Sequence, residues 1–380
     1  MRRRSMPVAA WVLAAGLLTT AAPCFAQGVD QAQLEQYIRA RQAFDEAAQA
    51  YWRSVAERRS LRFAKRRNSQ PVELDDYVLT QPPVYTGPPR PPGYRPPRRD
   101  PSEPRLPIPV VADFLAAAAE QYKFMPDRPK SEAEFKQAYA KVATAAGLTR
   151  EQAVRIYSFE TGGNGTYDGQ AGLVGAGGPK AGRPISPAIG YNQLLSTNTL
   201  SLLAEHGNKF VAALKESAAA LTGAEQQAME RKITSLQKMI AFSRTVPQKW
   251  SEQDKLAKTT RGGIGVHAAV LDRDIGPLLQ TQKLLDSVLF ARMKGHAKPL
   301  TAAELELMNF TGDGNGFDMV LMPQELRERV PTANFFQRGG YERNPIARRT
   351  GTVANLFAAI ETKMDRASQA QGAKELAEAF

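Results

Sequence analysis

One glutamate, Glu160, stands where a predicted helix gives way to a glycine-rich loop. Thr149 and Gln152 have the spacing of a capping box, which predicts that the helix begins near Arg150. Positions that then share one face, at i, i+3, i+4 and i+7, are Ala153, Ile156, Tyr157 and Glu160. Glu160 is therefore expected on the apolar stripe of the helix and not on its wet face.

A carboxyl group in that position could act as a proton donor. Loss of water around it disfavours the charged form and raises its pKa toward neutrality, where general acid catalysis works best. Gly162, Gly163 and Gly165 follow, and residues without side chains leave space for a bulky ligand. The alternative stays open at this point: the glutamate head lies in solvent at the edge of the stripe, and the glycines only end the helix.

A second motif makes the combination more specific. Residues 188–195 read AIGYNQLL, and Glu160 is followed by Thr161. Together these residues resemble the lysozyme-like lytic transglycosylase domain of the soluble lytic transglycosylase (SLT) type. Its signature is a helix ending in Glu-Ser or Glu-Thr, followed by Ala-x-Gly-Leu-Met-Gln-Leu-Met. Tyr191 and Asn192 replace the usual Leu-Met pair.

This resemblance implies a catalytic mechanism that needs one protein carboxyl group. Glu160 would protonate the glycosidic oxygen between MurNAc and GlcNAc and then accept a proton from the 6-hydroxyl of the sugar, giving a 1,6-anhydro product. Gln193 and Tyr191 would contact substrate or hold the loop beside Glu160. The substrate-binding residues implied in this way are Thr161, Gly190, Tyr191, Asn192, Gln193, Asn309 and Phe310.

The chain departs from the family pattern in two places. Glu160 and Gln193 are further apart than is usual, and the surplus is the glycine-rich stretch GQAGLVGAGGPKAGRP. The third family signature, Tyr-Asn-Ala-Gly, is represented at best by residues 308–312, MNFTG, where either Asn309 or Phe310 stands in the place of the tyrosine. These departures leave room for a non-catalytic peptidoglycan-binding or scaffolding protein, or for a muramidase-type hydrolase.

Other candidate sites are weaker. Residues 313–318, DGNGFD, resemble a calcium loop, but Phe317 stands where oxygen ligands or glycine are needed, so we expect a glycine-rich groove loop instead. His206, His267 and His296 lack zinc-site spacing and are expected to be surface or packed residues. Asp168 is a weak candidate for a second carboxylate of a hydrolase. We expect neither a metal nor a cofactor.

The N-terminus has the layout of a secretory signal peptide. Arg2, Arg3 and Arg4 precede an apolar run, and cleavage is expected after Ala26, which predicts a periplasmic protein. The single cysteine, Cys24, would leave with the signal, and Pro23 before it disfavours a lipoprotein. An exported protein is not expected to bind nucleic acid.

A basic arm and a proline-rich linker are expected before the main domain. Tyr37, Phe44 and Tyr51 recur every seventh residue and predict a long amphipathic helix, which packs within the chain or recruits another wall protein. Basic residues of this part include Arg53, Arg58, Arg59, Arg62, Lys65, Arg66 and Arg67. They account for much of the formal charge of +12 and are expected either to attract a polyanion such as the cell wall or to be merely solvated.

The resulting architecture is mainly α-helical. We expect a signal peptide over residues 1–26, an amphipathic helical arm over 27–68, a proline-rich linker over 69–109 and a lysozyme-like transglycosylase domain over 110–380. Helical patterns dominate after Val110, including one long helix over 266–293 and a capped helix after Thr301. The predicted partners are peptidoglycan glycan strands.

Overall fold

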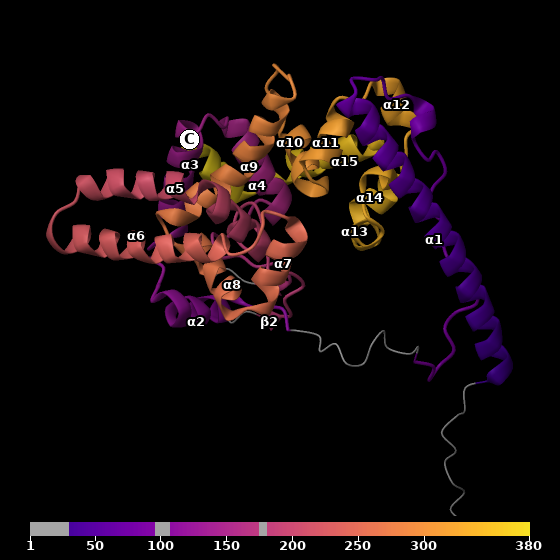
Figure 1. The fold of residues 1–380 in the computed structure, drawn as a ribbon, viewed down its shortest axis with the longest axis horizontal. Coiled ribbons are helices and arrows are strands. Elements are labelled where there is room, and N and C mark those ends of the chain that lie inside the picture. Colours follow the sequence, from indigo (N-terminus) through magenta and orange to yellow (C-terminus); the bar gives the residue numbers. More distant parts are fainter. Residues whose placement is uncertain (1–29, 96–106, 175–180) are drawn as a thin grey trace, which may run out of the picture. The chain divides into compact units, whose positions relative to one another are not determined.

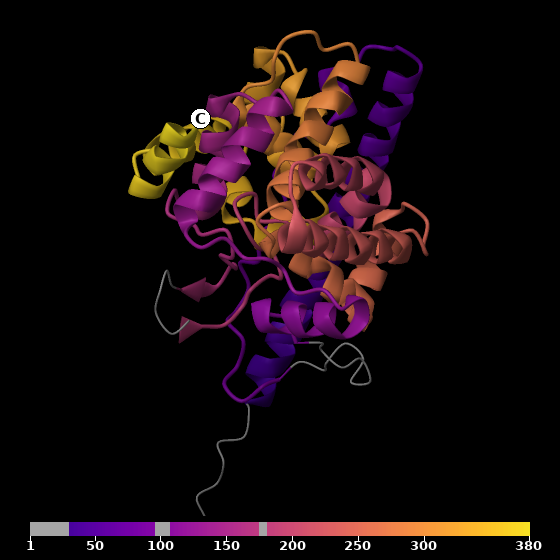
Figure 2. The same cartoon turned by 90° about the vertical axis from the view of Figure 1, so that its left-hand side faces the viewer.

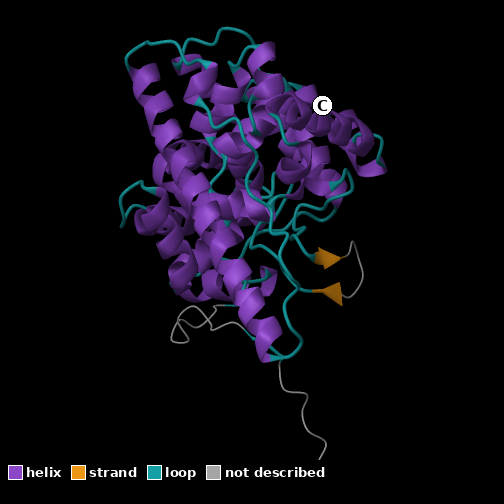
Figure 3. Ribbon diagram, turned by 90° about the vertical axis from the view of Figure 1, so that its right-hand side faces the viewer, coloured by secondary structure: helices purple, strands orange, loops and turns teal. Residues whose placement is uncertain are grey.

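The computed structural model describes residues 30–95, 107–174 and 181–380. The predicted signal peptide, with Cys24, lies outside these residues. The described chain is mainly helical, as expected, and its strands are β1 (Leu173–Val174) and β2 (Ala181–Gly182), which pair antiparallel. Figure 3 shows this strand pair in orange beside the purple helices, joined to them by loops. The described chain divides into two units, one formed by residues 30–48 with 83–95, and the other by 49–82 with the described residues from 107 onward.

In the first unit, the proline-rich segment packs against the helix before it. This helix, α1 (Gln31–Arg67), begins in the first unit and ends in the second. The Tyr85 ring lies edge-on to Phe44, with centroids 5.5 Å apart, and the Tyr37 ring meets Tyr94 at 5.8 Å. The Arg41 guanidinium lies 4.8 Å from the centre of the Phe44 ring. Residues 83–95 are therefore not a free spacer, because proline-rich chain without regular hydrogen bonds still buries its tyrosines here.

The beginning of the predicted linker is also folded, as part of the second unit. It contains the short 3-10 helix η1 (Leu74–Asp76), and Tyr77 is only 5% exposed. Asn334 holds the segment in place, because its amide accepts a hydrogen bond from the N–H of Val78 at 2.9 Å and donates to the Val78 carbonyl at 2.8 Å. The expected linker over 69–109 is thus incorrect for residues 70–82, whose polar backbone groups find partners far away in the sequence.

Much of the basic arm has internal partners. Arg59 and Arg62 are buried and donate hydrogen bonds to the backbone carbonyls of Asn334, Phe336 and Asp76. Lys65 pairs with Asp76 at 2.7 Å, and Arg66 pairs with the buried Asp318. These four cations stabilise the second unit, so only part of the arm is left to attract a polyanion.

Sixteen α-helices are found in the described residues, and α1 is followed by fifteen in the second unit. The first eight of them are α2 (Val111–Tyr122), α3 (Glu132–Ala145), α4 (Arg150–Thr161), α5 (Ser196–Ala219), α6 (Gly223–Ser243), α7 (Trp250–Thr259), α8 (Arg261–Val266) and α9 (Ile275–Met293). The others are α10 (Ala302–Thr311), α11 (Asp313–Val320), α12 (Gln324–Arg329), α13 (Arg338–Arg343), α14 (Pro345–Thr350), α15 (Val353–Ala367) and α16 (Gln371–Ala379). Figure 1 shows α5 and α6 as an antiparallel pair.

Local sequence signals placed several helix ends correctly. The capping boxes at Thr149 and Thr301 form as predicted, and Gly147 follows α3 with a positive φ of 87°. The helix expected over 266–293 is instead broken into η2 (His267–Leu271) and α9. The buried Asp272 causes the break, because its carboxylate accepts the N–H groups of Asp274 and Ile275 and so begins a new helix.

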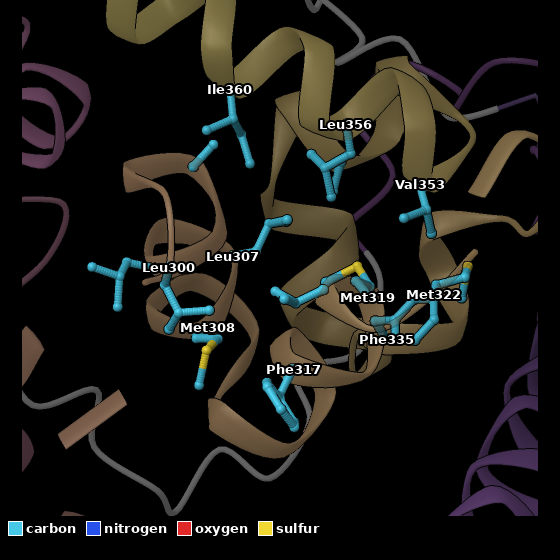
Figure 4. Close-up of a cluster of buried hydrophobic side chains, with 14 of the residues drawn as sticks. Leu300, Leu307, Met308, Phe317, Met319, Met322, Phe335, Val353, Leu356 and Ile360 are labelled. Atoms are coloured by element: carbon cyan, nitrogen blue, oxygen red, sulfur yellow. The ribbon is translucent and has the colours of Figure 1, made fainter. Parts of the chain in front are cut away.

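Three clusters of buried apolar side chains hold the second unit together. The first, shown in part in Figure 4, joins α10, α11 and α15 with the end of α1. The second lies between α2, α5, α6 and α9. The third lies between α3, α4 and α16, and Figure 2 shows the C-terminal helices in yellow beside the magenta helices α3 and α4. Helix α4 contributes Ile156 and Phe159 to the first cluster and Tyr157 to the third, which fixes its orientation.

Within the described ranges, no helix combines the length and the apolar character that crossing a membrane requires.

We predict that Asn334→Ala destabilises the protein by about 1–3 kcal/mol, because the N–H and C=O of Val78 would lose their partners in a partly buried place. Urea unfolding checks this value. Asn68→Ala, at an exposed position, serves as the control. A change of the same small size in both variants would contradict the packing of residues 70–82.

Candidate functional site

Glu160 lies in the last turn of α4, at the edge of the buried face. Ala153, Ile156 and Tyr157 on the same stripe are fully buried, whereas Glu160 is partly exposed. Gly162 ends the helix in the left-handed conformation, with a φ of 71° that a glycine adopts without strain. The stripe therefore carries the carboxyl group of Glu160 to the boundary between the core and the loop after α4.

A second carboxyl group, that of Glu306, lies against Glu160. Glu306 belongs to α10 and is completely buried. Both of its side-chain oxygens are buried, and among the described residues neither has a hydrogen-bond partner of good geometry. The carboxyl of Glu160 is in hydrogen-bonding contact with Glu306 and raises its pKa, while the nearby amide of Asn309 lowers it. Since two carboxylates have no hydrogen to donate, this contact requires a proton on one of them.

The surroundings of the pair keep that proton in place. Burial, and then the charge of Glu160, raise the pKa of Glu306 well above its usual range. Burial also raises the pKa of Glu160, to about 7, although the hydrogen bond from Glu306 works in the opposite direction. Two like charges in contact in a poorly solvated place cannot both form easily. Near neutral pH the pair therefore holds Glu306 protonated, while Glu160 exchanges its own proton.

Asn309 and two lysines support the charged form of Glu160. Asn309 lies one turn after Glu306 on α10, and its Nδ2 donates a hydrogen bond to Oε1 of Glu160 at 3.0 Å. The positive charges of Lys363 and Lys283 lower the pKa of Glu160. The Lys363 ammonium lies 3.7 Å from the centre of the Phe159 ring, which places it beside the end of α4. These groups offset part of the effect of burial, so that Glu160 can both give and regain a proton.

A cavity of about 300 Å³ opens beside Glu160. Its wall is made by the end of α4, the loop after it and Gln193. The lining residues are Glu160, Thr161, Asn164, Gly165, Thr166, Gly169, Gln170, Ala171, Gly172, Leu173 and Gln193. Most of them are glycines or small polar residues, so a ligand would meet backbone N–H and C=O groups and side-chain amides and hydroxyls. Such a surface suits a ligand rich in hydroxyl and amide groups.

The loop with Gly190 and Gln193 forms the second wall of this cavity. Gln193 has a φ of 42°, which is rare for a residue with a side chain. Its amide Nε2 donates to the carbonyls of Gly169 and Gly190, at 3.1 and 2.8 Å. These two bonds tie the loop to the chain that follows α4 and leave Oε1 of Gln193 as an acceptor. Gly190 has no room for a side chain, because a Cβ there would lie 2.0 Å from Nε2 of Gln280.

Tyr191 and Asn192 point into the core instead of the cavity. Tyr191 is completely buried, and its hydroxyl donates to Oε1 of Glu132 at 2.5 Å. Asn192 is 2% exposed, and its side chain donates to the carbonyl of Gln280 at 2.9 Å. Of the two roles expected for Tyr191, holding the loop fits this position, and contact with substrate does not. The same correction applies to Asn192, because the tight loop turns both side chains inward.

The remaining predicted site residues lie near the end of α4. They are Thr161, Asn309 and Phe310. Thr161 lines the cavity, and its hydroxyl donates to the carbonyl of Tyr157 at 2.7 Å. Asn309 reaches the carboxyl of Glu160, as described above. Phe310 packs between other rings, with centroids 6.3 Å from Phe159 and 5.6 Å from Phe336. Of the two residues that compete for the third motif, Asn309 is therefore the one beside Glu160.

The other candidate residues named from the sequence have partners within the fold. Asp168 pairs with Arg128 at 2.6 Å and accepts a bond from the hydroxyl of Thr166. His267 is buried between Thr199 and the carbonyl of Pro187, and burial lowers its pKa to about 4. The glycine-rich loop expected over 313–318 is wrong, because these residues form most of α11. In the described ranges, no three potential ligand side chains gather in a way that could hold a metal ion.

Glu306 is the residue that reasoning from the sequence missed. A signal was present, because Glu306 lies between Leu305 and Leu307 in a predicted helix, and Asn309 follows it one turn later. A charged residue on an apolar face was the feature that singled out Glu160. Nothing in the local pattern, however, indicates that α4 and α10 pack together.

Comparison of the chain with protein-family models, with curated proteins and with solved structures gave no match, so these comparisons establish no family for it.

We predict that Glu306→Gln changes how stability depends on pH. The pKa of Glu306 is raised by folding, so the folded state keeps a proton that the unfolded state loses above its ordinary pKa, and stability decreases as pH rises. Replacement by the uncharged glutamine removes this contribution. The free energy of unfolding should then fall less between about pH 5 and about pH 8 than in the unchanged protein. Glu230→Gln, at an exposed position on α6, should leave the decrease as it is; equal slopes in all three proteins would contradict a buried protonated Glu306.

Proposed function

We propose that this protein is an exported lytic transglycosylase with a lysozyme-like helical domain, and that it cleaves the MurNAc–GlcNAc linkage of peptidoglycan. The observation that carries the proposal is the carboxyl of Glu160, whose pKa is about 7, at the wall of a polar cavity that also includes Gln193. A carboxyl that is half protonated near neutral pH can act as acid and then as base. The motif residues around Glu160 and Gln193 support the same reading.

The proposed reaction needs one carboxyl group that faces the substrate. Glu160 donates its proton to the glycosidic oxygen while the C1–O bond breaks, and the N-acetyl group of the substrate assists at C1. The ionised Glu160 then takes the proton of the 6-hydroxyl as that oxygen bonds to C1. The products are a 1,6-anhydro sugar and a free hydroxyl, and no water is consumed. Glu306 keeps its own proton and positions Glu160 through their hydrogen bond.

The arrangement of the two carboxyl groups favours this route over hydrolysis by a carboxylate pair. Glycosidases of that kind hold their carboxyl groups about 5–10 Å apart, on opposite sides of the scissile bond. Glu160 and Glu306 are in hydrogen-bonding contact, and the buried Glu306 has no access to a substrate. Asp168, the other candidate for a second carboxylate, pairs with Arg128.

We predict that Glu160→Gln lowers the release of soluble fragments from purified sacculi by about 10²–10⁴-fold, because the amide cannot protonate the glycosidic oxygen. Mass spectrometry of the released fragments measures both rate and product. The expected products end in anhydro sugars and are lighter than hydrolysed ones by one water molecule. The exposed Glu230→Gln serves as the matched control and should keep full activity.

The same digestion separates the alternatives. Reducing-end products that depend on Glu160 would replace the proposal by a muramidase-type hydrolase. Sacculi that bind the unchanged protein but release no fragments would show a non-catalytic wall-binding or scaffolding protein.

The pH profile gives a further test. Activity requires a protonated Glu160 in the first step, so it should fall as pH rises above about 7. Asn309 lowers the pKa of Glu160 by donating to its carboxylate, so Asn309→Ala should move this decline to higher pH and reduce the maximal rate by about tenfold. An unchanged profile in Asn309→Ala would show that Glu160 is not the group that titrates.

A further inference from the structure

A second and larger cavity, of about 690 Å³, lies between the end of α1, the end of α9 and α11. All the residues that line this cavity belong to the second unit. The cavity shares no lining residue with the one beside Glu160. Its volume is in the range that binds small ligands. It is therefore a separate candidate site, and what it binds does not depend on the function proposed above.

The lining of this cavity is mainly apolar and aromatic. Phe63, Phe290 and Phe317 contribute their rings, and the rings of Phe290 and Phe317 meet edge-on with centroids 5.9 Å apart. Pro71 and Leu321 extend the apolar surface, and Leu321 is 50% exposed. Phe63 and Phe290 are partly exposed, whereas Phe317 is only 5% exposed and supports them from the core. Accessible apolar side chains in a concave place favour an apolar ligand, because binding removes their surface from water.

Positive charge surrounds these rings. Arg66 pairs with the buried Asp318, the only carboxylate among the lining residues. Arg67 and Lys294 also line the cavity, and in the described part of the chain neither has a carboxylate as an ion-pair partner. The Lys294 ammonium lies 5.7 Å from the centre of the Phe290 ring, so one cation borders the aromatic wall directly. An anionic group would therefore meet Arg67 and Lys294 beside the apolar lining.

We propose that this cavity binds an amphiphilic anion, that is, an apolar chain which ends in a phosphate or carboxylate. The chain packs on Phe63, Phe290 and Phe317, and the anionic group meets Arg67 and Lys294. A neutral amphiphile lacks the second contact, and an inorganic anion lacks the first. The same chemistry is found in a free amphiphile and in an anionic membrane lipid, and the experiment below distinguishes these two sources.

Gly314 allows the cavity to be closed without disturbing its walls. It lies on α11 and lines the cavity, and a Cβ at this position would have Phe63 as its nearest neighbour, at 4.0 Å. Gly314→Leu should therefore fill the space that the ligand's chain would take. Gly340 on α13 gives the matched control, because a Cβ there would have no neighbour within 4 Å. Both changes place leucine at a helical glycine, so their effects on helix stability are similar.

The test is calorimetric titration of the purified protein with dodecyl phosphate below its micelle concentration. One molecule is expected to bind per chain. Gly314→Leu and the double variant Arg67→Ala, Lys294→Ala should each weaken binding by at least about tenfold, whereas Gly340→Leu should leave it unchanged. Equal binding by the Gly314→Leu variant, by neutral dodecyl maltoside or by inorganic phosphate would overturn the proposal.

Flotation with vesicles identifies the source of the ligand. Vesicles of phosphatidylglycerol that bind the unchanged protein but not the Gly314→Leu variant would support a membrane lipid. Vesicles that fail to bind a protein which does bind dodecyl phosphate would support a free amphiphile. Thermal unfolding of each variant in the absence of ligand confirms that the loss of binding does not come from a loss of folding.

Discussion

The contact between Glu160 and Glu306 is the constraint on which the site depends. Glu306 is fully buried and Glu160 is partly exposed, and such a pair is tolerated only while it keeps a proton, because the charged form of each group loses water that would stabilise it. Helices α4 and α10 must pack closely to make the contact, and α15 packs against both. The apolar cluster that joins these helices thus brings together two groups that are costly to bury, and the cost appears as raised pKa values.

On the side of Glu160 that faces away from this apolar cluster, the surroundings are polar and open to solvent. Glycines and small polar residues form the cavity, while the loop that forms its second wall is anchored from behind by the buried Tyr191 and Asn192. The inward side chains give the loop a fixed position and leave its backbone and Gln193 at the cavity. A rigid support of this kind is what a site needs when a proton must be transferred over a short distance.

The end of α1 is joined to the rest of the second unit by buried polar contacts as well as by apolar packing. Arg59 and Arg62 donate to backbone carbonyls near Asn334, and Asn334 in turn holds the chain at Val78. The pairing of Arg66 with Asp318 draws α1 toward α11 and leaves the aromatic cavity between them. Removing one partner from such a network is expensive, because a buried group is then left unpaired.

The sequence by itself determined the features that depend on neighbours along the chain. Capping boxes at Thr149 and Thr301 began helices as predicted, and the stripe on α4 located Glu160, because caps and helical periodicity act over a few residues. Only the tertiary structure decided which stripes meet. It placed Glu306 against Glu160, turned Tyr191 inward and folded residues 70–82 against Asn334, since each of these contacts joins residues far apart in the chain. A periodic pattern shows that a face is buried, but it does not specify the partner that buries it.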